Sequence, residues 1–257
     1  MENILTLTYF ELKKFWTIKR AIIFGAFFIV IIGLSLLPKA FDLPTLNMQL
    51  NLDAVLVTPL AFFVPVFVLL FTGGIVSNDV RTFYLRTVLS RPVTKEEYLT
   101  SKYLFSFINL IIGTILFAVI PSIVGLYSYG GEVNLNIGTS SLIYLLYLVE
   151  GLLFISISML LSSFLKGFFN IFVLAIWIFL EASLINGVVS NFVAFSKPLA
   201  IISDFFFPAG FSEASKLINT GSILFYESIM WGIASLAFFV SMSYYRITKI
   251  SIDSNMD

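Results

Sequence analysis

The sequence predicts an all-α integral membrane protein, with six helices that cross the membrane and an N-terminal helix that lies at its surface. Three observations support this prediction. Hydrophobic residues make up 59% of the 257 positions, and the mean hydropathy is +0.99. A soluble domain of this size would leave much of that apolar surface in contact with water. The apolar residues also gather in runs long enough to cross a bilayer, and most charges lie between the runs.

The charge balance and the missing residue types exclude several classes of function. The 15 basic residues are balanced by 15 acidic ones and form no basic tract, so we expect no nucleic-acid partner. Cys and His are both absent. Their absence excludes disulfides, thiol nucleophiles, zinc sites built from Cys and His, haem held by His, and a Ser-His-Asp triad. We therefore expect no catalytic residue, metal site or cofactor in this chain.

Residues 1–20 form the first predicted unit, an amphipathic helix. Leu5, Tyr9, Leu12 and Trp16 recur at helical spacing, and Thr and basic residues lie on the opposite side. This pattern favours a helix in the membrane interface, where Trp and Tyr sit at the depth of the headgroups. The alternative is that these residues are the basic start of the first span.

Six apolar runs then predict a six-span domain over residues 21–250, followed by a short tail, 251–257. The first run has 17 residues, and at ~1.5 Å per residue it is just long enough to cross the bilayer. Only Lys166 and Gly167 separate the fourth run from the fifth, which predicts an antiparallel helical hairpin. The runs cover residues 21–37, 55–76, 103–127, 141–165, 168–190 and 222–245.

The distribution of basic residues predicts the orientation in the membrane. If both termini are cytoplasmic, three of the 15 basic residues, Lys39, Lys197 and Lys216, fall outside, and the other twelve fall inside. Basic residues favour the cytoplasmic side of a membrane protein. We therefore expect a multi-pass protein of the cell membrane with both termini in the cytoplasm.

The segment Ser77–Lys102 between the second and third runs carries eight of the thirty formal charges of the chain. A first short helix is expected over residues 79–89, with an apolar stripe on one side. Arg81 and Arg86 lie off that stripe, so they are free to face water or headgroups. The excess of basic residues places the segment in the cytoplasm.

A proline divides this segment into two parts. Pro92 stops the first short helix. Thr94 and Glu97 then have the spacing of a capping box, in which each side chain bonds to the backbone amide of the other residue. The sequence thus predicts a second short helix directly after the break.

Residues Val88–Leu99, V-L-S-R-P-V-T-K-E-E-Y-L, are followed by Lys102. They resemble the first cytoplasmic loop of type-2 ABC exporter permeases, whose pattern is close to L-L-S-R-P-V-S-R-x-E-hydrophobic-L with a Lys shortly after. In that family the loop holds a coupling helix that docks on a separate ATPase subunit. A solvated basic loop of another polytopic protein is the alternative. The residues that the resemblance assigns to docking are Ser90, Arg91, Pro92, Val93, Thr94, Lys95, Glu96 and Glu97.

The resemblance implies that the chain is the permease subunit of an ATP-driven ABC exporter. It also implies a homodimer, or a pseudo-dimer with a related permease, and a cytosolic ATPase subunit that binds ATP and Mg. The chain has no G-x-x-x-x-G-K-[ST] loop of its own to hold nucleotide phosphates, so we do not expect it to be an enzyme. Two other classes stay open: a polytopic scaffold or assembly factor that transports nothing, and an ion-coupled carrier.

Two carboxylates within the predicted spans are the remaining chemical signal. Glu150 and Glu181 lie at about the same predicted depth on consecutive antiparallel helices, and no Lys or Arg lies within the predicted spans. A carboxylate at that depth is costly unless it is protonated, hydrogen-bonded or in contact with a wet cavity. The two residues either line a substrate path or form hydrogen bonds between helices, beside Ser156 or Asn170. Glu227 lies nearer the outer surface.

Overall fold

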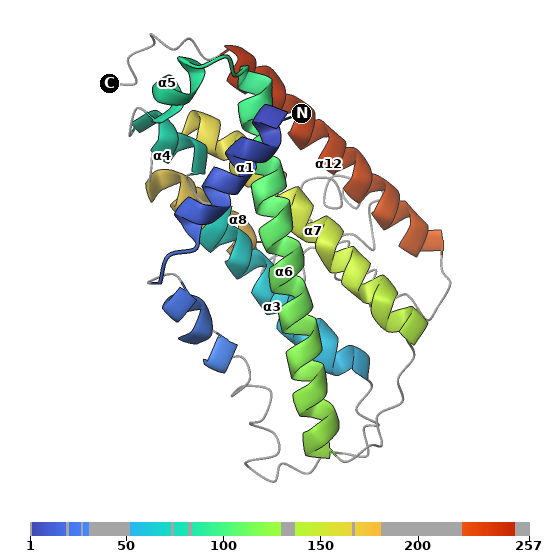
Figure 1. Ribbon diagram of the computed structural model, residues 1–257. Helices are drawn as coiled ribbons and strands as arrows, with labels where there is room; N and C mark the ends of the chain where they lie inside the picture. Colours follow the sequence, from blue (N-terminus) through green and yellow to red (C-terminus); the bar gives the residue numbers. More distant parts are fainter. Residues whose placement is uncertain are drawn as a thin grey trace.

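The structure is a computed structural model, in which the described residues fall into nine ranges. Nearly all described residues are helical, and no strand occurs among them, which confirms the all-α class. Figure 1 shows the helices packed side by side, with the N-terminus and the last turns of the C-terminal helix at the same end of the bundle. The described residues are 2–18, 21–26, 28–30, 52–72, 75–81, 84–129, 137–165, 168–180 and 223–249.

Two of the described helices contain segments long and apolar enough to cross a membrane. They are Lys95–Phe117 within α6 (Lys95–Tyr129) and Tyr144–Phe164 within α7 (Ile137–Phe164). This finding gives partial support to the predicted membrane protein, and the six-span layout stays a prediction. The first of the two segments begins at Lys95, whereas the sequence predicts a span from residue 103. The segment therefore includes two lysines, Lys95 and Lys102, that the prediction places outside the spans.

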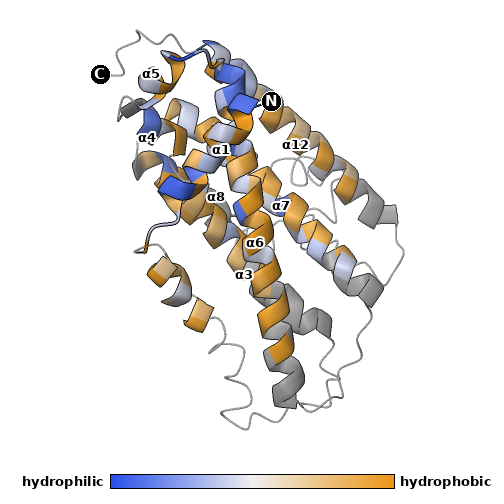
Figure 2. Ribbon diagram, viewed as in Figure 1, coloured by the Kyte–Doolittle hydropathy of each residue, from blue (hydrophilic) through white to orange (hydrophobic). Residues whose placement is uncertain are grey.

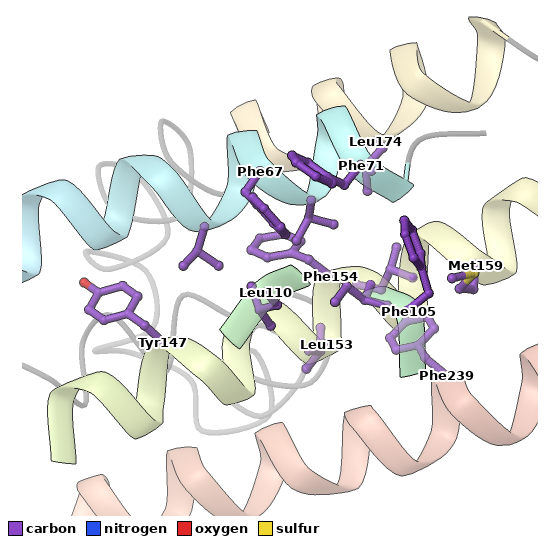
Figure 3. Close-up of a cluster of buried hydrophobic side chains, with 14 of the residues drawn as sticks. Phe67, Phe71, Phe105, Leu110, Tyr147, Leu153, Phe154, Met159, Leu174 and Phe239 are labelled. Atoms are coloured by element: carbon purple, nitrogen blue, oxygen red, sulfur yellow. The ribbon is translucent and has the colours of Figure 1, made fainter. Parts of the chain in front are cut away.

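Helix α7 lies at the centre of the bundle. It contacts α3 (Leu52–Thr72), α8 (Phe168–Leu180) and α12 (Ile223–Lys249), and also α6. Apolar side chains from all five helices meet in one core, as Figure 3 shows. Helix α8 follows α7 after the short connection that predicted a hairpin, and the two helices are in contact. Core residues labelled in Figure 3 include Phe67, Phe71, Phe105, Leu110, Leu153, Phe154, Leu174 and Phe239.

Two glycines allow the central helices to approach closely. A Cβ atom added at Gly113 of α6 would lie 2.7 Å from Cζ of Phe63 on α3. A Cβ atom added at Gly151 of α7 would lie 2.7 Å from Cδ2 of Leu110 on α6. The ring of Phe63 stacks on Phe117, with the ring centroids 3.6 Å apart. Small residues at such contacts are typical of packed membrane helices, so larger side chains at either glycine would push these helices apart.

The N-terminal helix α1 runs over Glu2–Phe15 and packs on α6. It ends earlier than the predicted helix, because Trp16 and Thr17 are not helical. Leu5 and Tyr9 of the predicted apolar stripe are 64% and 62% exposed. Further along the stripe, Leu12 packs against the main core, and Nε1 of Trp16 donates to Oδ1 of Asn109. The part of the stripe that is open to the predicted membrane interface is therefore its first half.

The segment between α3 and α6 differs from the prediction in two ways. Two helices, α4 (Ile75–Arg81) and α5 (Tyr84–Leu89), take the place of the single helix expected over residues 79–89. The second short helix is not separate, because α6 starts at Lys95 and continues through the candidate span. No Gly or Pro lies between Lys95 and Ile112 to break it. The side chains of Arg81 and Arg86, and residue Phe83, lie outside the described part.

The hydrophilic residues gather at one end of the bundle. Figure 2 shows them on α1, on α4, at the start of α6 and near the end of α12, whereas the rest of the helices is mainly apolar. This end carries the loop that resembles the docking loop of ABC permeases.

Candidate functional site

The loop Ser90–Glu97 is folded tightly by short-range hydrogen bonds. The backbone amide of Thr94 donates to Oε2 of Glu97 at 3.0 Å, and the amide of Glu97 donates to Oγ1 of Thr94 at 3.1 Å. The predicted capping box is therefore confirmed, and it marks the start of α6. On the other side of Pro92, the amide of Arg91 donates to the Val88 carbonyl at 3.2 Å. These bonds join the loop firmly to the helices before and after it.

Most side chains of this loop face outward. Val93, Lys95 and Glu97 are half-buried. Nζ of Lys95 donates to the backbone carbonyl of Thr248 in α12 at 3.1 Å. Lys95 is therefore turned toward the protein, whereas Arg91 is left at the surface. The exposed loop residues are Ser90, Arg91, Pro92, Thr94 and Glu96.

A small apolar cluster supports the loop from below. Its buried members come from α5 and from the first turn of α6, and a leucine of α1 packs against them. This cluster is separate from the main core, so the loop has a packing unit of its own. The buried members are Leu85, Val88 and Tyr98, and the residues packed on them are Leu7, Tyr84, Leu89 and Val93.

Beside this apolar cluster lies a buried group of charges, which we call the charge cluster: Glu11 of α1, Asp79 of α4, and Lys102 of α6. Nζ of Lys102 lies 2.7 Å from Oε1 of Glu11 and 2.5 Å from Oδ2 of Asp79. The Lys102 side chain is 1% exposed, and the two carboxylates are 8% and 5% exposed. The hydroxyl of Tyr98 also donates to Oδ2 of Asp79, at 2.8 Å. Buried charges of this kind need their partners, because an unpaired ion in the interior is very costly.

Lys14 of α1 adds a second positive charge at the edge of the charge cluster. Its Nζ lies 3.5 Å from Oδ1 of Asp79 and 4.2 Å from the centre of the Tyr84 ring, while 56% of its side chain is exposed. Burial, followed by the nearby carboxylates of Glu11 and Asp79, raises the pKa of Tyr84 to about 12. Tyr84 therefore stays neutral at physiological pH, and its ring offers the lysine a cation–π contact.

The opposite flank of α6 contacts α12 through neutral groups as well as through the bond from Lys95 to the Thr248 carbonyl. Oγ1 of Thr100 lies 2.8 Å from the hydroxyl of Tyr244, and the hydroxyl of Tyr103 lies 2.8 Å from Oγ of Ser243. The rings of Tyr103 and Tyr244 stack with their centroids 6.0 Å apart. The first turns of α6, which carry the loop, are thus held by α1 on one flank and by α12 on the other.

A serine of α7 positions the helix that carries Asp79. The backbone amides of Val76 and Ser77, at the start of α4, donate to Oγ of Ser162 at 3.0 and 2.9 Å. One side chain thereby satisfies two of the free amides at the start of this short helix. The central helix therefore fixes the place of the charge cluster from beneath.

Comparison with protein families adds one finding. Residues 20–252 match the family described as "Protein of unknown function (DUF2705)". The chain belongs to this family. The matched region includes the loop, Asp79 and Lys102, and it begins beyond Glu11, so α1 lies outside it. No protein of curated function matches the sequence.

The charge cluster of this DUF2705 protein did not emerge from the sequence. The count of basic residues places Lys102 with the cytoplasmic charges. The apolar repeat of α1 predicts a stripe that faces the membrane interface, and it predicts no role for Glu11. A weak signal exists in hindsight, because Tyr98 and Lys102 are four residues apart and so share one face of α6. Nothing in the spacing shows that this face meets Glu11 and Asp79.

The structure describes one of the two predicted intramembrane carboxylates. Glu150 is 4% exposed, and its Oε2 has no hydrogen-bond partner among the described residues. Ser156 donates to the Leu152 carbonyl of its own helix at 2.8 Å, and the amide atoms of Asn170 have no partner within the described part. Glu181 lies outside the described residues, as does the side chain of Glu227. The pairing of Glu150 with Glu181 therefore stays a prediction.

Among the described residues, no group of three or more His, Cys, Asp or Glu side chains is arranged to hold a metal ion. At this end of the protein, five residues of the loop are exposed and the charges beneath it are paired.

Proposed function

We propose that this DUF2705 protein is the membrane-spanning permease subunit of an ATP-driven ABC transporter, an exporter, and that Ser90–Glu97 docks on a separate cytosolic ATPase subunit. The observation that supports this most directly is the structure of the loop. It is exposed at the hydrophilic end of the bundle, folded by its own hydrogen bonds, and continuous with a helix that contains a candidate span.

A docking loop has to pass force from one subunit to another. Because the capping box starts α6 directly, no flexible linker separates the loop from the helix. Helix α6 has 35 residues, and at ~1.5 Å per residue it is longer than a bilayer core is thick. A push on the loop would therefore move a whole helix, as in the rigid-body transitions of many switching proteins.

The membrane layout belongs to the same proposal. Six spans, with both termini in the cytoplasm, put this loop on the side where a cytosolic ATPase can reach it. The ATP and Mg sites are on the partner, and two permease chains, identical or related, form the transport path. Two candidate spans in the described helices and the twelve-to-three distribution of basic residues support this layout.

Charge reversal at one exposed position tests the docking role. Arg91 is the better target, because replacing Lys95 would also break its bond to Thr248 in α12. We expect Arg91→Glu to weaken co-purification with the proposed cytosolic ATPase subunit, and to lower permease-stimulated ATP hydrolysis about tenfold, as for a lost charged contact at an interface. Lys13→Glu, an equal charge change on the exposed side of α1, is the matched control.

Two results would contradict the docking role. Unchanged association and unchanged ATP hydrolysis in Arg91→Glu would remove the loop from the interface. An equal loss in Arg91→Glu and Lys13→Glu would show that overall charge, and not contact at the loop, governs association.

A further inference from the structure

We infer that α1 and the loop Ser90–Glu97 form one mechanical unit, and that Lys102 is the positioning residue that holds this unit together. The inference goes beyond the proposed function, because it concerns contacts within this chain and holds whether or not an ATPase docks on the loop. Three features of the structure support it. One face of α1 contacts the loop and the residues beneath it, Lys102 pairs with residues of two other helices, and the opposite face of α1 is exposed.

The first feature is a set of three contacts on one face of α1. Asn3, Leu7 and Glu11 are spaced four residues apart, so they lie along the same side of the helix. Nδ2 of Asn3 donates to the Pro92 carbonyl at 3.2 Å. Leu7 packs on the apolar cluster beneath the loop, and Glu11 pairs with Lys102. The loop and the first turns of α6 together therefore rest on α1 over more than two helical turns.

The second feature is that Lys102 joins three segments that are far apart in the sequence. It extends from α6, a little beyond the capping box, to Glu11 of α1 and to Asp79 of α4. Without its ammonium group, two buried carboxylates would face each other, and among the described residues the remaining cation paired with them is the half-exposed Lys14. Such an arrangement favours separation of the helices that carry the two carboxylates, so that each can reach water.

The third feature is the exposed side of α1. Leu5, Tyr9 and Phe10 are each more than half exposed, so most of this side is open and it adds little packing against the described helices. The attachment of α1 depends on the face that holds Glu11 and on Phe15 and Trp16 at its end, where Nε1 of Trp16 donates to Oδ1 of Asn109 at 3.0 Å. A displaced loop would therefore carry the start of α1 with it.

Cysteine reporters can test this inference directly, because the chain has no cysteine of its own. Thr8→Cys reports on the buried face of α1, and Val93→Cys reports on the underside of the loop. Ser163→Cys, buried near the same end of α7, is the reference. Each reporter is placed in the full-length protein with Lys102→Met or, as matched control, with Lys13→Met. The rate of reaction with N-ethylmaleimide is then measured in detergent.

We expect Lys102→Met to raise the labelling rate at both position 8 and position 93 by about tenfold or more, as for a local opening of the structure. The rate at position 163 should not change, and Lys13→Met should change none of the three. A rise at position 8 alone would show that α1 detaches from α6 while the loop stays in place, and would overturn the inference. No rise at either position would overturn the role of Lys102.

A second variant decides the matter if Lys102→Met unfolds the protein, which a rise at position 163 would reveal. Leu7→Ala removes an apolar contact of the same face and leaves the charges in place. We expect it to raise labelling several-fold at position 93, on the loop, as well as at the neighbouring position 8. A rise confined to position 8 would contradict the inference. Neither experiment includes an ATPase, so its outcome is independent of the docking test with Arg91→Glu.

Discussion

The two flanks of α6 are held in different ways. Figure 1 shows α1 and α12 lying along the first turns of this helix on either side. The α1 flank contains buried ions, with Lys102 between Glu11 and Asp79, beside the contacts of Phe15 and Trp16. The α12 flank contains no buried ion pair among the described residues: it has neutral hydroxyl groups, stacked tyrosine rings and the bond from Lys95 to a backbone carbonyl. Both flanks act on the same helix, the one that begins at the loop.

This difference has a consequence for how each contact fails. In a buried ion cluster, the loss of one member leaves the others charged and without partners, so the whole contact is lost together. A neutral hydroxyl contact loses less when one group is removed, provided that the remaining group keeps another hydrogen-bond partner. Ser243, for example, also donates to the Val240 carbonyl at 2.7 Å. We therefore expect the α1 flank to release in one step and the α12 flank to weaken gradually.

The largest expected effect is that of Lys102→Met on stability. Breaking a buried ion pair by removing one partner typically costs about 3–5 kcal/mol of unfolding free energy. Thermal unfolding of the purified protein in one detergent, compared with wild type, measures the loss. Lys14→Met removes a cation that is 56% exposed and 3.5 Å from the same Asp79, and we expect a loss of about 1 kcal/mol or less. Equal losses in the two variants would show that burial does not govern this cluster.

A smaller effect is expected on the α12 flank. Tyr103→Phe removes the hydroxyl that lies 2.8 Å from Oγ of Ser243 and keeps the stacked ring. We expect a loss of about 0.5–1.5 kcal/mol, the usual net contribution of a neutral hydrogen bond. Tyr245→Phe, on an exposed position of α12, is the control and should have no effect. A loss as large as that of Lys102→Met would mean that the two flanks do not differ in kind.

The features that the sequence predicted are local ones. The capping box depends on Thr94 and Glu97, which are three residues apart, and both of its predicted hydrogen bonds are present in the structure. The charge cluster joins positions 11, 79 and 102, and no pattern within one helix encodes such a meeting. Rules for membrane topology count basic residues by segment and treat each as exposed. That is why Lys102, which is buried, was assigned to the cytoplasmic charges.

The prediction of a separate second short helix was wrong for a related reason. The sequence showed where a helix starts, at the cap, and where an apolar run starts, at residue 103, and we took these as two helices. The charged first turns and the apolar remainder form one helix, because charges at the start of a helix do not break it and can stabilise its N-terminus. A change in hydropathy is therefore a poor marker of a helix boundary when no Gly or Pro accompanies it.

Glu150 extends the comparison to a buried carboxyl group that has no cation beside it among the described residues. In the charge cluster, a variant that removes Lys102 leaves the carboxylates of Glu11 and Asp79 without this partner. At Glu150, Oε2 bonds to none of the described residues, so the loss of its charge would leave no described group unpaired at that atom. Gln keeps the shape and the hydrogen-bonding capacity of the side chain. We therefore expect Glu150→Gln to change the unfolding free energy by less than about 0.5 kcal/mol.

Transport in reconstituted vesicles decides whether the carboxyl group itself is needed. If Glu150 has a structural role, the pH profile of transport for Glu150→Gln, and for Glu150→Gln with Glu181→Gln, should match that of wild type, because a neutral amide can make the same hydrogen bonds. A stable variant whose transport falls, or whose pH profile shifts, would instead place the carboxyl group in the substrate path. A large loss of stability in Glu150→Gln would show that Glu150 has an ionic partner outside the described residues, and the contrast with Lys102 would then disappear.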